Sequence, residues 1–461
     1  MAVKKGQKVK VKAVDFGSKG EAVCKYKGFT IFVPKGVIGD QLLVEITKKK
    51  NSYAVGKIVE ILKKSDKRQN PPCKYFNRCG GCQIQDFKYK EQLKFKKSKV
   101  ENTIKRIAEI KDFEINNTIG MEKPFNYRNK GQFPIKYDQG KIKIGFYEIG
   151  SHNIVDIDKC IIQNEVTVKI KRILKGFIIN NRSVSIYNEK KHKGLLRHLV
   201  VRSSIETGEV MIVLVTNGKD IPNQQELIDR FTQIKGVKSI YQNINTNKGN
   251  KILGNKNKLV YGKKKITTKL DDLKFKLSPL SFFQINNLQT QKLYNKVLEY
   301  ADLTCKERVF DLYCGLGSIS IFLAREAKSV IGIEIVKEAI KDARKNAKLN
   351  NIENTKFYDG RAKDIISKLY SEGKKADVVV LDPPRKGCDK VVLETLVKMN
   401  VKKIVYVSCK PSTLARDLKF LTNNNYELKE VQPVDMFPHS THVETVTKLC
   451  LNSNVSNWLK F

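Results

Sequence analysis

From about residue 281 onward, compact apolar runs alternate with amphipathic helical patterns. The apolar runs are "RVFDLYCG", "SVIGIEI", "ADVVVLDPP" and "KKIVYVSC", each about the length of one buried strand. Strands that alternate with helices in this way predict parallel strands joined by crossover helices, an open doubly wound α/β sheet. We therefore expect residues 281–461 to form a Rossmann-like domain that binds its ligands at the carboxyl ends of the strands.

Residues 1–62 follow another pattern, in which short alternating strands are separated by glycines. The runs "QKVKVKAVDF" and "GEAVCKYKGFTIFVP" are examples, and lysines crowd their polar positions. Several short strands with turn signals at this spacing predict a small OB-like β-barrel. A nucleic-acid-binding face and a merely solubilising face would both look like this, so the segment alone does not decide between them.

The break "KKSDKRQNPPC" is polar and bears prolines, and we place a domain boundary there. Residues 63–280 are mostly strand-like with one or two helices, which predicts a central α+β domain. Within it, residues 87–110 carry apolar side chains at helical spacing, with lysines around them. This helix could pack on the domain formed by residues 281–461 despite its position in the chain.

The charge of the chain is strongly unbalanced, with 88 Lys and Arg against 47 Asp and Glu and a formal net charge of +41. Such an excess repels itself within a folded protein, and a polyanionic partner is the usual reason for it. A lysine-rich proteome would also contribute, but nucleic acid is favoured because acidic residues have not risen in step. No apolar run reaches the roughly 18 residues of a membrane helix, so we expect a cytoplasmic, soluble, monomeric protein without a membrane partner.

The segment "VFDLYCGLGSIS" at 309–320 combines a strand, a glycine-bearing loop and the start of a helix. Gly315 and Gly317 would let the backbone approach a ligand at the helix N-terminus. Asp311 lies just before the loop, and Glu334 ends the next strand, where an acid can bind both hydroxyls of a ribose. The loop lacks the third glycine of the dinucleotide fingerprint and a phosphate-binding lysine, which favours S-adenosylmethionine over NAD.

Asp382 follows the strand in "VVLDPPRKG" and is itself followed by two prolines. We expect its side chain at the carboxyl ends of the strands, beside a backbone that the prolines stiffen. An acid that merely caps a turn would be the default interpretation of this residue alone. Its place after two other strand ends that carry acids favours a cofactor-binding or catalytic role.

Five ordered motifs carry a resemblance that extends nearly from end to end of the chain. The motifs "SPLSFFQIN", "DLYCGLGSIS", "LDPPRKG", "SCKPSTLARDL" and "DMFPHSTHVETV" together resemble the S-adenosylmethionine-dependent RNA uracil-5 methyltransferases. The resemblance implies that residues 1–62 are a TRAM domain, an OB-like RNA-binding module. A barrel together with a cysteine cluster is similar to the enzymes that form 5-methyluridine in 23S rRNA. Transfer RNA is the alternative substrate, since archaeal-type relatives carry similar additions.

Methylation of uracil carbon 5 requires a nucleophile, because that carbon is unreactive until a thiolate adds to carbon 6. Cys409 follows the strand "KKIVYV", next in order to the strand that ends at Asp382. The resemblance implies that Cys409 is the nucleophile, and we expect Lys410 and Arg416 to lower its pKa. Many family members have Asn where this chain has Lys410. Cys314 is the competing thiol, but its place inside the glycine loop favours packing.

A base must then remove the proton from carbon 5, and "THVETV" offers His442 and Glu444. The resemblance selects Glu444, and partial burial of this carboxyl on a strand would raise its pKa toward the working range. His442 remains the alternative. Asp382 is expected to share the catalytic crevice with Cys409 and Glu444.

The resemblance also assigns ligand contacts to "SPLSFFQIN" and to the glycine loop. Gln284, Tyr313 and Glu334 are expected to contact S-adenosylmethionine. Phe282 or Phe283 could stack on the target base, which must leave its stack to reach the thiol; of the two we name Phe282. Asn286 is a further expected contact of the base.

"CKYFNRCGGC" places three cysteines, Cys73, Cys79 and Cys82, on a short glycine-bearing loop, and Cys160 follows far downstream. One CxxC without a nearby His suits a [4Fe–4S] cluster better than zinc, although spacing leaves zinc open. The resemblance strengthens the iron–sulfur interpretation, with a role in folding and RNA docking rather than in redox chemistry. The scattered cysteines are expected to pack, namely Cys24, Cys305, Cys314, Cys388 and Cys450.

Two rival functions remain from the residues. One is a non-catalytic RNA-binding or chaperone protein that keeps the fold, which the presence of Cys409, Glu444 and Asp382 disfavours. The other is an N- or O-directed methyltransferase, which would use the same crevice without a thiol. The sequence names neither the modified nucleotide nor whether one or two uridines are methylated.

Overall fold

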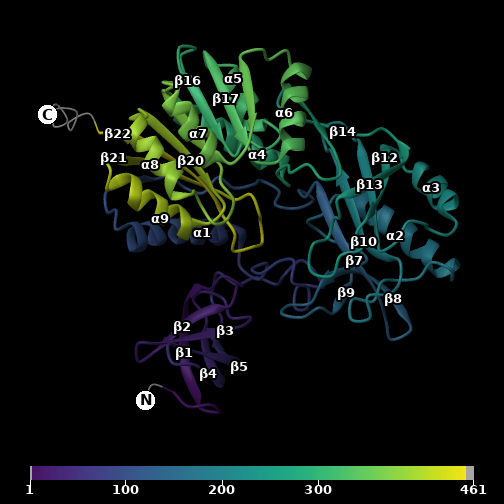
Figure 1. Ribbon diagram of the computed structural model, residues 1–461. Helices are drawn as coiled ribbons and strands as arrows, with labels where there is room; N and C mark the ends of the chain where they lie inside the picture. Colours follow the sequence, from purple (N-terminus) through teal and green to yellow (C-terminus); the bar gives the residue numbers. More distant parts are fainter. Residues whose placement is uncertain (1–2, 453–461) are drawn as a thin grey trace.

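The computed structural model describes residues 3–452, so residues 453–461 of the expected third domain lie outside the described residues. Its strands form a closed barrel, a seven-stranded sheet, a two-stranded sheet and an eight-stranded sheet. Figure 1 shows three regions, with the barrel below, the seven-stranded sheet to the right and the eight-stranded sheet to the upper left. No helix in the described part is both long enough and apolar enough to span a membrane.

The N-terminal strands close into a five-stranded barrel in the order β1-β2-β3-β5-β4, as the alternating pattern predicts. In β1, buried Val9, Val11 and Ala13 alternate with exposed residues, so the barrel interior takes every second side chain. Cys24 lies in this apolar interior. The last strand ends one residue beyond the expected boundary. The strands are β1 (Lys8–Phe16), β2 (Ala22–Tyr26), β3 (Phe29–Val33), β4 (Gln41–Lys49) and β5 (Tyr53–Lys63).

The central region is built on a seven-stranded sheet in the order β13-β12-β11-β10-β7-β8-β9. Helices α2 and α3 cover one face, where Leu174, Phe177 and Phe231 are fully buried against the strands. The strands are β7 (Lys130–Asp138), β8 (Lys141–Tyr147), β9 (Ile154–Asp156), β10 (Leu196–Ser203), β11 (Val210–Thr216), β12 (Val237–Ile244) and β13 (Lys256–Gly262), and the helices are α2 (Glu165–Asn180) and α3 (Gln224–Thr232).

The C-terminal region is built on a mixed sheet in the order β18-β17-β16-β19-β20-β22-β21-β6. β18, β17, β16, β19 and β20 are parallel, as the sequence predicts, but β22 runs antiparallel between β20 and β21. The strands are β6 (Glu114–Ile115), β16 (Arg308–Leu312), β17 (Ser329–Glu334), β18 (Thr355–Asp359), β19 (Val378–Leu381), β20 (Lys403–Ser408), β21 (Tyr426–Val434) and β22 (Glu444–Leu451). The antiparallel strand is what brings the beginning of β22 to the ligand-binding edge.

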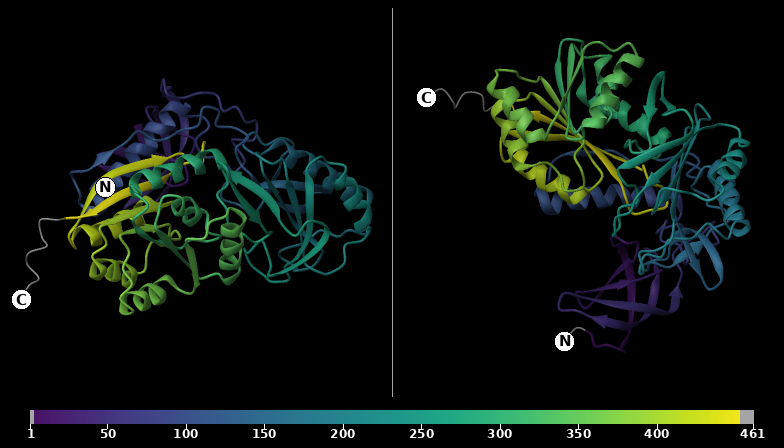
Figure 2. Two further views of the ribbon diagram at one scale, coloured as in Figure 1. Left: turned by 90° about the horizontal axis from the view of Figure 1, so that it is seen from above. Right: turned by 45° about the vertical axis from the view of Figure 1, so that its right-hand side comes forward.

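Helices cover both faces of this sheet. One face carries α4, α5 and α6, and the other carries α7, α8, α9 and α1. Helix α1 and the π-helical turn η1 therefore belong spatially to the C-terminal region, where α1 lies beneath α9 (Figures 1 and 2). Their bounds are α1 (Tyr89–Thr103), η1 (Ile104–Ala108), α4 (Asn287–Ala301), α5 (Ser318–Ala324), α6 (Lys337–Leu349), α7 (Ala362–Ser371), α8 (Lys390–Met399) and α9 (Pro411–Thr422).

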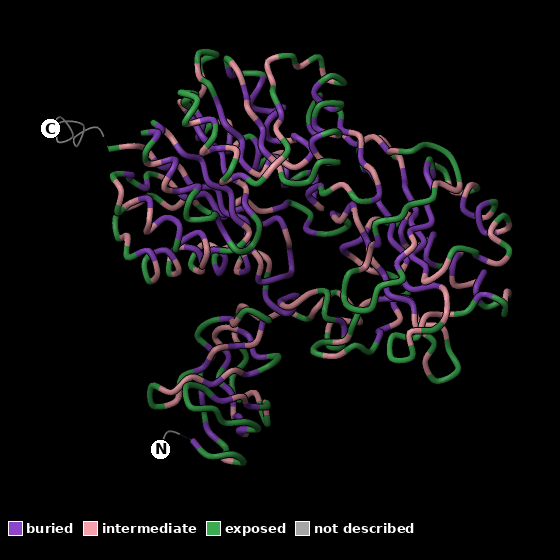
Figure 3. The backbone as a smooth tube through the Cα atoms, in the orientation of Figure 1, coloured by how far each residue is buried: buried purple, intermediate pink, exposed green. Residues whose placement is uncertain are grey.

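A hairpin links the central and C-terminal regions. β14 (Ile266–Leu270) and β15 (Leu273–Leu277) pair with each other, and β15 contacts α6. Their buried side chains share one apolar cluster with Val200 and Val213 of the central sheet and with Leu293 of α4. Buried residues run along the strands of both sheets in Figure 3. The expected boundary at residue 280 therefore lies within a continuous core.

Candidate active site

The register of the C-terminal sheet places the expected nucleophile opposite the expected base. Ser408, the last residue of β20, pairs with Thr445 of β22. Cys409 follows Ser408 in the chain, and Glu444 precedes Thr445. Because an antiparallel pair sets these neighbours side by side, both side chains lie at the carboxyl end of β20. The glycine loop after β16 opens at the same edge.

Three carboxyl groups gather at this edge, and burial raises the pKa of each. Asp382 follows β19 and has its pKa raised to about 7. Burial and then Asp382 raise the pKa of Glu444 to about 8. Burial, with Asp382 as a further cause, raises the pKa of Asp311 to about 7. Groups that hold or release a proton near neutral pH suit general acid–base chemistry.

The environment of Cys409 corrects the expectation about its cation. Burial, then Glu444 and Asp382, raise the pKa of the thiol, while the guanidinium of Arg385 beside it acts in the opposite direction. Arg416 instead bonds Asp417 at 2.6 Å, and the Lys410 side chain is exposed. The cation that favours the thiolate is therefore Arg385, in the loop "LDPPRKG". The sequence places Arg385 shortly after Asp382, which could have indicated a role at this site. Its distance from Cys409 along the chain gave no reason to pair it with the thiol.

The thiol also stands at the start of α9. Pro411 occupies the first helical turn, where its missing N–H costs nothing, and the helix begins directly after Lys410. Helix N-termini carry partial positive charge and favour thiolates. The helix N-terminus and Arg385 both act against burial and the two carboxyl groups, which raise the pKa of the thiol.

His442, the alternative base, has different chemistry. Burial, followed by the positive charge of Arg385, lowers the pKa of His442 to about 4. A group that releases its proton so readily is a weak base at neutral pH, whereas the raised pKa of Glu444 matches a proton acceptor. The structure therefore favours Glu444 over His442 for proton abstraction.

The glycine loop is shaped as an open cradle. Gly315 adopts φ +56°, and a side chain there would meet no atom within 4 Å, so space lies open above it. Gly317 adopts φ +82° beside Ala343. The carboxylate of Glu334 accepts hydrogen bonds from the backbone N–H of Gly315 at 3.2 Å and of Val336 at 2.8 Å. The acid is thereby fixed at the rim of the cradle.

Other side chains complete this cradle. Asp311 accepts a hydrogen bond from Ser320 through Oδ2, while its buried Oδ1 has no partner among the described residues. Ile335, next to Glu334, is 63% exposed. Tyr313 adopts a positive φ of +70°, and its phenol lies beside Cys388. The Tyr313 side chain thus packs against the apolar cluster that includes Cys388 and Tyr406.

The segment 278–286 divides into exposed and buried parts. Phe282 is 71% exposed, whereas Phe283 is buried and packs against Phe275. Gln284 is buried, and its carbonyl accepts a hydrogen bond from Asn129 at 2.8 Å. Of the two phenylalanines, the exposed Phe282 is the one free to stack on a base.

Asn286 corrects another expectation. Its side chain is fully buried and caps α4 by accepting from the Gln289 N–H at 3.3 Å. The amide nitrogen donates to the Met436 carbonyl at 3.2 Å. Both the oxygen and the nitrogen of this side-chain amide are therefore bonded within the protein, and the residue acts as a helix cap. The expected contact with the target base is therefore not supported.

The loop between β21 and Glu444 is held from below by α1, which sequence reasoning did not anticipate. Lys96 and Asp435 form an ion pair in which both side chains are fully buried. Tyr89 donates to the other oxygen of Asp435 at 2.7 Å, and Lys99 donates to the Thr441 carbonyl at 2.7 Å. Helix α1 thus positions the loop that leads to Glu444.

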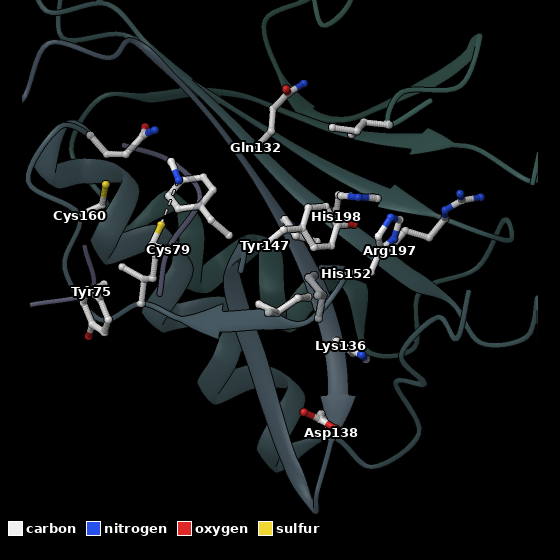
Figure 4. Close-up of a pocket in the computed structure, with 18 of the residues that line it drawn as sticks. Tyr75, Cys79, Gln132, Lys136, Asp138, Tyr147, His152, Cys160, Arg197 and His198 are labelled. Atoms are coloured by element: carbon white, nitrogen blue, oxygen red, sulfur yellow. Dashed lines mark hydrogen bonds between the residues drawn. The ribbon is translucent and has the colours of Figure 1, made fainter. Parts of the chain in front are cut away.

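The four clustered cysteines line one cavity of about 960 Å³. Figure 4 shows Cys79 and Cys160 at one end of it, with Arg197 and His198 toward the other. Burial is the largest cause that raises the pKa of Cys79 to about 11 and of Cys82 to about 12, and the other cysteine thiols add to it. No three His, Cys, Asp or Glu side chains in the described ranges close around a single metal ion.

The remaining cysteines differ in their surroundings. Cys24, Cys314 and Cys388 are buried, as expected for packing residues, and Cys314 lies in the core beneath the glycine loop. Cys450 is half-buried. Cys305 is exposed in the turn before β16, so the packing expectation is wrong for this residue.

Comparisons with known proteins agree on one family. The family model described as tRNA (uracil-5-)-methyltransferase matches residues 88–451. A Clostridium tetani protein named as an uncharacterized RNA methyltransferase is 50% identical over 445 residues, which cover 96% of each chain. A similarly named protein of Caldanaerobacter subterraneus is 49% identical over 446 residues, covering 96% of this chain and 98% of the other.

Among solved structures, the chain is similar to a tRNA (uracil-54, C5)-methyltransferase from Pyrococcus abyssi in complex with S-adenosyl-L-homocysteine. The TM-score is 0.77 at 30% sequence identity, and the match covers 96% of this chain and 100% of that one. The similarity therefore includes the barrel and the central region as well as the C-terminal sheet.

Proposed function

The chain belongs to the tRNA (uracil-5-)-methyltransferase family, and we propose that it transfers a methyl group from S-adenosylmethionine to carbon 5 of a uridine in RNA. The observation that carries this proposal is the pairing of Ser408 with Thr445, which sets Cys409 and Glu444 together at the edge of the sheet. An N- or O-directed methyltransferase would have no use for this thiol. A non-catalytic RNA-binding protein would need neither the thiol nor the base.

The residues divide the reaction between them. The Cys409 thiolate adds to carbon 6 of uracil, and the carbon 5–carbon 6 double-bond electrons shift to leave carbon 5 nucleophilic. Bound S-adenosylmethionine would supply the electrophilic methyl group to carbon 5, with the sulfur–methyl bond broken and S-adenosylhomocysteine left as the product. Glu444 then accepts the carbon 5 proton, the double bond reforms, and the bond between sulfur and carbon 6 breaks to return the thiolate. Arg385 favours the thiolate both when it adds to carbon 6 and when it is released at the end of the reaction.

The cradle around the glycine loop fits S-adenosylmethionine. The unpartnered buried Oδ1 of Asp311 suits an ammonium group, and Glu334, held by two backbone N–H groups, suits the ribose hydroxyls. The exposed Ile335 offers apolar surface to an adenine ring. We include Gln284, Tyr313, Gly315, Gly317 and Asp382 in the same cofactor site.

The test of the nucleophile uses RNA that contains 5-fluorouridine, in which fluorine blocks removal of the substituent at carbon 5. The wild type should form a covalent adduct that survives denaturing electrophoresis, and Cys409→Ala should form none. Cys314→Ala is the matched control and should form the adduct as the wild type does. An adduct that persists in Cys409→Ala contradicts the assignment of the nucleophile.

The base is tested separately with ordinary uridine. Glu444→Gln should accumulate a covalent intermediate that already carries the methyl group, because the proton at carbon 5 cannot leave. His442→Gln should turn over and accumulate nothing. Unchanged turnover in Glu444→Gln would rule out its role as the base.

We further propose that Cys73, Cys79, Cys82 and Cys160 hold a [4Fe–4S] cluster. What supports the proposal is that all four cysteines line one cavity, and cysteine thiolates are the usual ligands of such clusters. The Gly81 N–H donates to the sulfur of Cys79 at 3.4 Å, a contact typical of cluster thiolates. Protein purified without oxygen should contain about four iron and four sulfide per chain, whereas zinc without sulfide would contradict the proposal.

As the target we propose a uridine in 23S rRNA, with residues 1–62 gripping the RNA, residues 63–280 carrying the cluster and residues 281–461 transferring the methyl group. Transfer RNA is the second candidate, because the similarity to the Pyrococcus abyssi tRNA enzyme spans both chains. Mapping of 5-methyluridine in ribosomal and transfer RNA from a deletion strain decides between them. Loss confined to tRNA would overturn the 23S rRNA assignment.

A further inference from the structure

Three cations gather where β7 and β10 meet, outside the residues that transfer the methyl group. Lys130 of β7 and Arg202 of β10 are direct partners across the antiparallel pair, so their side chains share one face. Arg128 lies two residues before Lys130 and is close enough to lower the pKa of its amine. We refer to Arg128, Lys130 and Arg202 as the cationic triad.

The triad lacks anionic partners within the part of the chain that the structure describes. None of the three forms an ion pair there. Arg202 is only 3% exposed, yet its Nε has no hydrogen-bond partner, and neither has the buried Nε of Arg128. The Nη2 of Arg202 donates a hydrogen bond to the Ser281 carbonyl. Burial, then Arg202 and Arg128, lower the pKa of Lys130 to about 7.

Such an arrangement is costly for the fold by itself. Arg202 is buried, and Arg128 and Lys130 are half-buried. Cations in such positions are ordinarily paired with anions, and placing three of them together adds mutual repulsion. The fold tolerates this when a ligand supplies the missing negative charge. Guanidinium forks beside an ammonium group are typical of phosphate recognition.

The triad borders the segment 281–285, which carries the exposed Phe282. Asn129, between Arg128 and Lys130, donates to the Gln284 carbonyl at 2.8 Å, and its own N–H bonds the Ile285 carbonyl at 2.9 Å. Arg202 bonds Ser281, the neighbour of the exposed Phe282. On its other side the triad reaches the cysteine cavity, because Arg128 is one of the residues that line it. Gln132 lines the same cavity and is labelled in Figure 4.

We propose that Arg128, Lys130 and Arg202 form a binding site for one backbone phosphate of the RNA, next to the nucleotide whose base reaches Cys409. This proposal rests on the proposed function and adds to it the path of the RNA strand over the protein. A uridine turned out of its stack exposes its flanking phosphates, and the triad supplies a fixed anchor for one of them. The strand then runs from Phe282 toward the cysteine cavity.

The test measures binding of a labelled oligouridylate as a function of salt, with Lys130→Gln and Arg128→Gln. Each should weaken binding severalfold at physiological salt and reduce the salt slope by about 0.7 for the lost phosphate contact on a single strand. Lys398→Gln, an exposed lysine on α8, is the matched control and should leave the slope unchanged. Slopes equal to that of the wild type in both triad variants would overturn the proposal.

A second measurement separates a phosphate contact from a structural effect. A neutral methylphosphonate placed beside a single uridine in the oligonucleotide should weaken binding to the wild type but not weaken binding to Lys130→Gln any further. Because Lys130 is an uncompensated charge, Lys130→Gln should melt at the same temperature as the wild type or higher. Additive losses at every methylphosphonate position would contradict a shared contact.

Failure of the proposed function would look different. If wild-type protein forms no adduct with 5-fluorouridine RNA, the methyl-transfer assignment fails, while the salt slopes still decide the phosphate site. If the wild type forms the adduct and the triad variants bind with an unchanged slope, only the phosphate site is wrong. S-adenosylmethionine binding, measured by calorimetry, should be equal in all variants.

Discussion

Arg385 is the cation that acts on the Cys409 thiol, whereas the carboxyl groups of Glu444 and Asp382 oppose the thiolate. The pKa of this thiol is set by opposing effects, because burial, then Glu444 and Asp382, raise it and Arg385 lowers it. A charge-assisted hydrogen bond contributes about 1.5–3 kcal/mol. Loss of Arg385 should therefore shift the balance clearly toward the unreactive thiol.

Arg385→Met should slow adduct formation with 5-fluorouridine RNA roughly ten- to hundredfold at neutral pH. The thiol pKa rises without the guanidinium, so the rate should recover as the pH is raised. Single-turnover rates at saturating RNA across a range of pH measure this. Arg385→Lys keeps the charge and should retain most of the rate, and Lys410→Ala should change little. A uniform loss at every pH would assign Arg385 to RNA binding instead.

Glu444 also affects stability. Its folded pKa of about 8 lies above the ordinary value of 4.5, so the folded protein holds a proton that the unfolded chain releases. Stability contributed by this group is present below pH 4.5 and is lost as the pH rises through 8. Glu444→Gln should therefore be more stable than the wild type by about 1–3 kcal/mol at pH 8, with no difference at pH 4. Melting temperatures at both values check this, and a constant difference would contradict it.

At the scale of elements, the sequence predicts the strand ends well but not what holds the base loop. Asp311, Glu334, Asp382 and Cys409 follow apolar runs that can be recognised one at a time, and parallel strands bring their ends together. The antiparallel β22 and the packing of α1 depend on contacts between distant parts of the chain. Lys96 and Asp435 are 339 residues apart in sequence, so no local pattern announces their pairing. Arg385 was missed for the same reason.

The buried pair between α1 and the base loop should be essential as a pair. Lys96→Met leaves Asp435 buried with Tyr89 as its remaining donor, and should lower the free energy of unfolding by about 3–5 kcal/mol. Lys96→Met combined with Asp435→Asn should recover most of that loss, because no charge is left unpaired. Urea denaturation of the four proteins of this double-mutant cycle measures the coupling. Additive losses would show that the two groups act independently.

At the scale of the whole molecule, the barrel is docked on α1 and not merely tethered. Phe16 of the barrel packs edge-on against Phe87 and Phe95 at 5.2 and 5.3 Å between ring centroids. Thr441 of the base loop donates to the Ser18 carbonyl at 3.0 Å. The sequence predicts a barrel of this kind but not its interface with α1. An aromatic residue at a strand end, such as Phe16, could equally pack in the core of the barrel. The barrel therefore touches the loop that leads to Glu444.

Phe16→Ala should weaken the interface between the barrel and α1. Truncation of a buried phenylalanine typically costs about 3–5 kcal/mol, and here the loss falls on the contact between the barrel and α1. Limited proteolysis should then cleave residues 64–72 faster and release the barrel. Methylation of a short oligonucleotide should change little, because the triad and the catalytic edge are intact, while kcat/KM on the full-length substrate RNA should fall about tenfold or more.

Phe32→Ala is the matched control, since Phe32 contacts Tyr53 within the barrel and away from α1. It should destabilise the barrel without freeing it, so cleavage of residues 64–72 should remain slow. If Phe16→Ala lowers activity on short and full-length RNA alike, the interface between the barrel and α1 affects the loop that carries Thr441, and not the binding of the RNA. If neither activity changes, the contact between barrel and α1 has no part in substrate recognition, and the barrel then acts as an independent RNA-binding module.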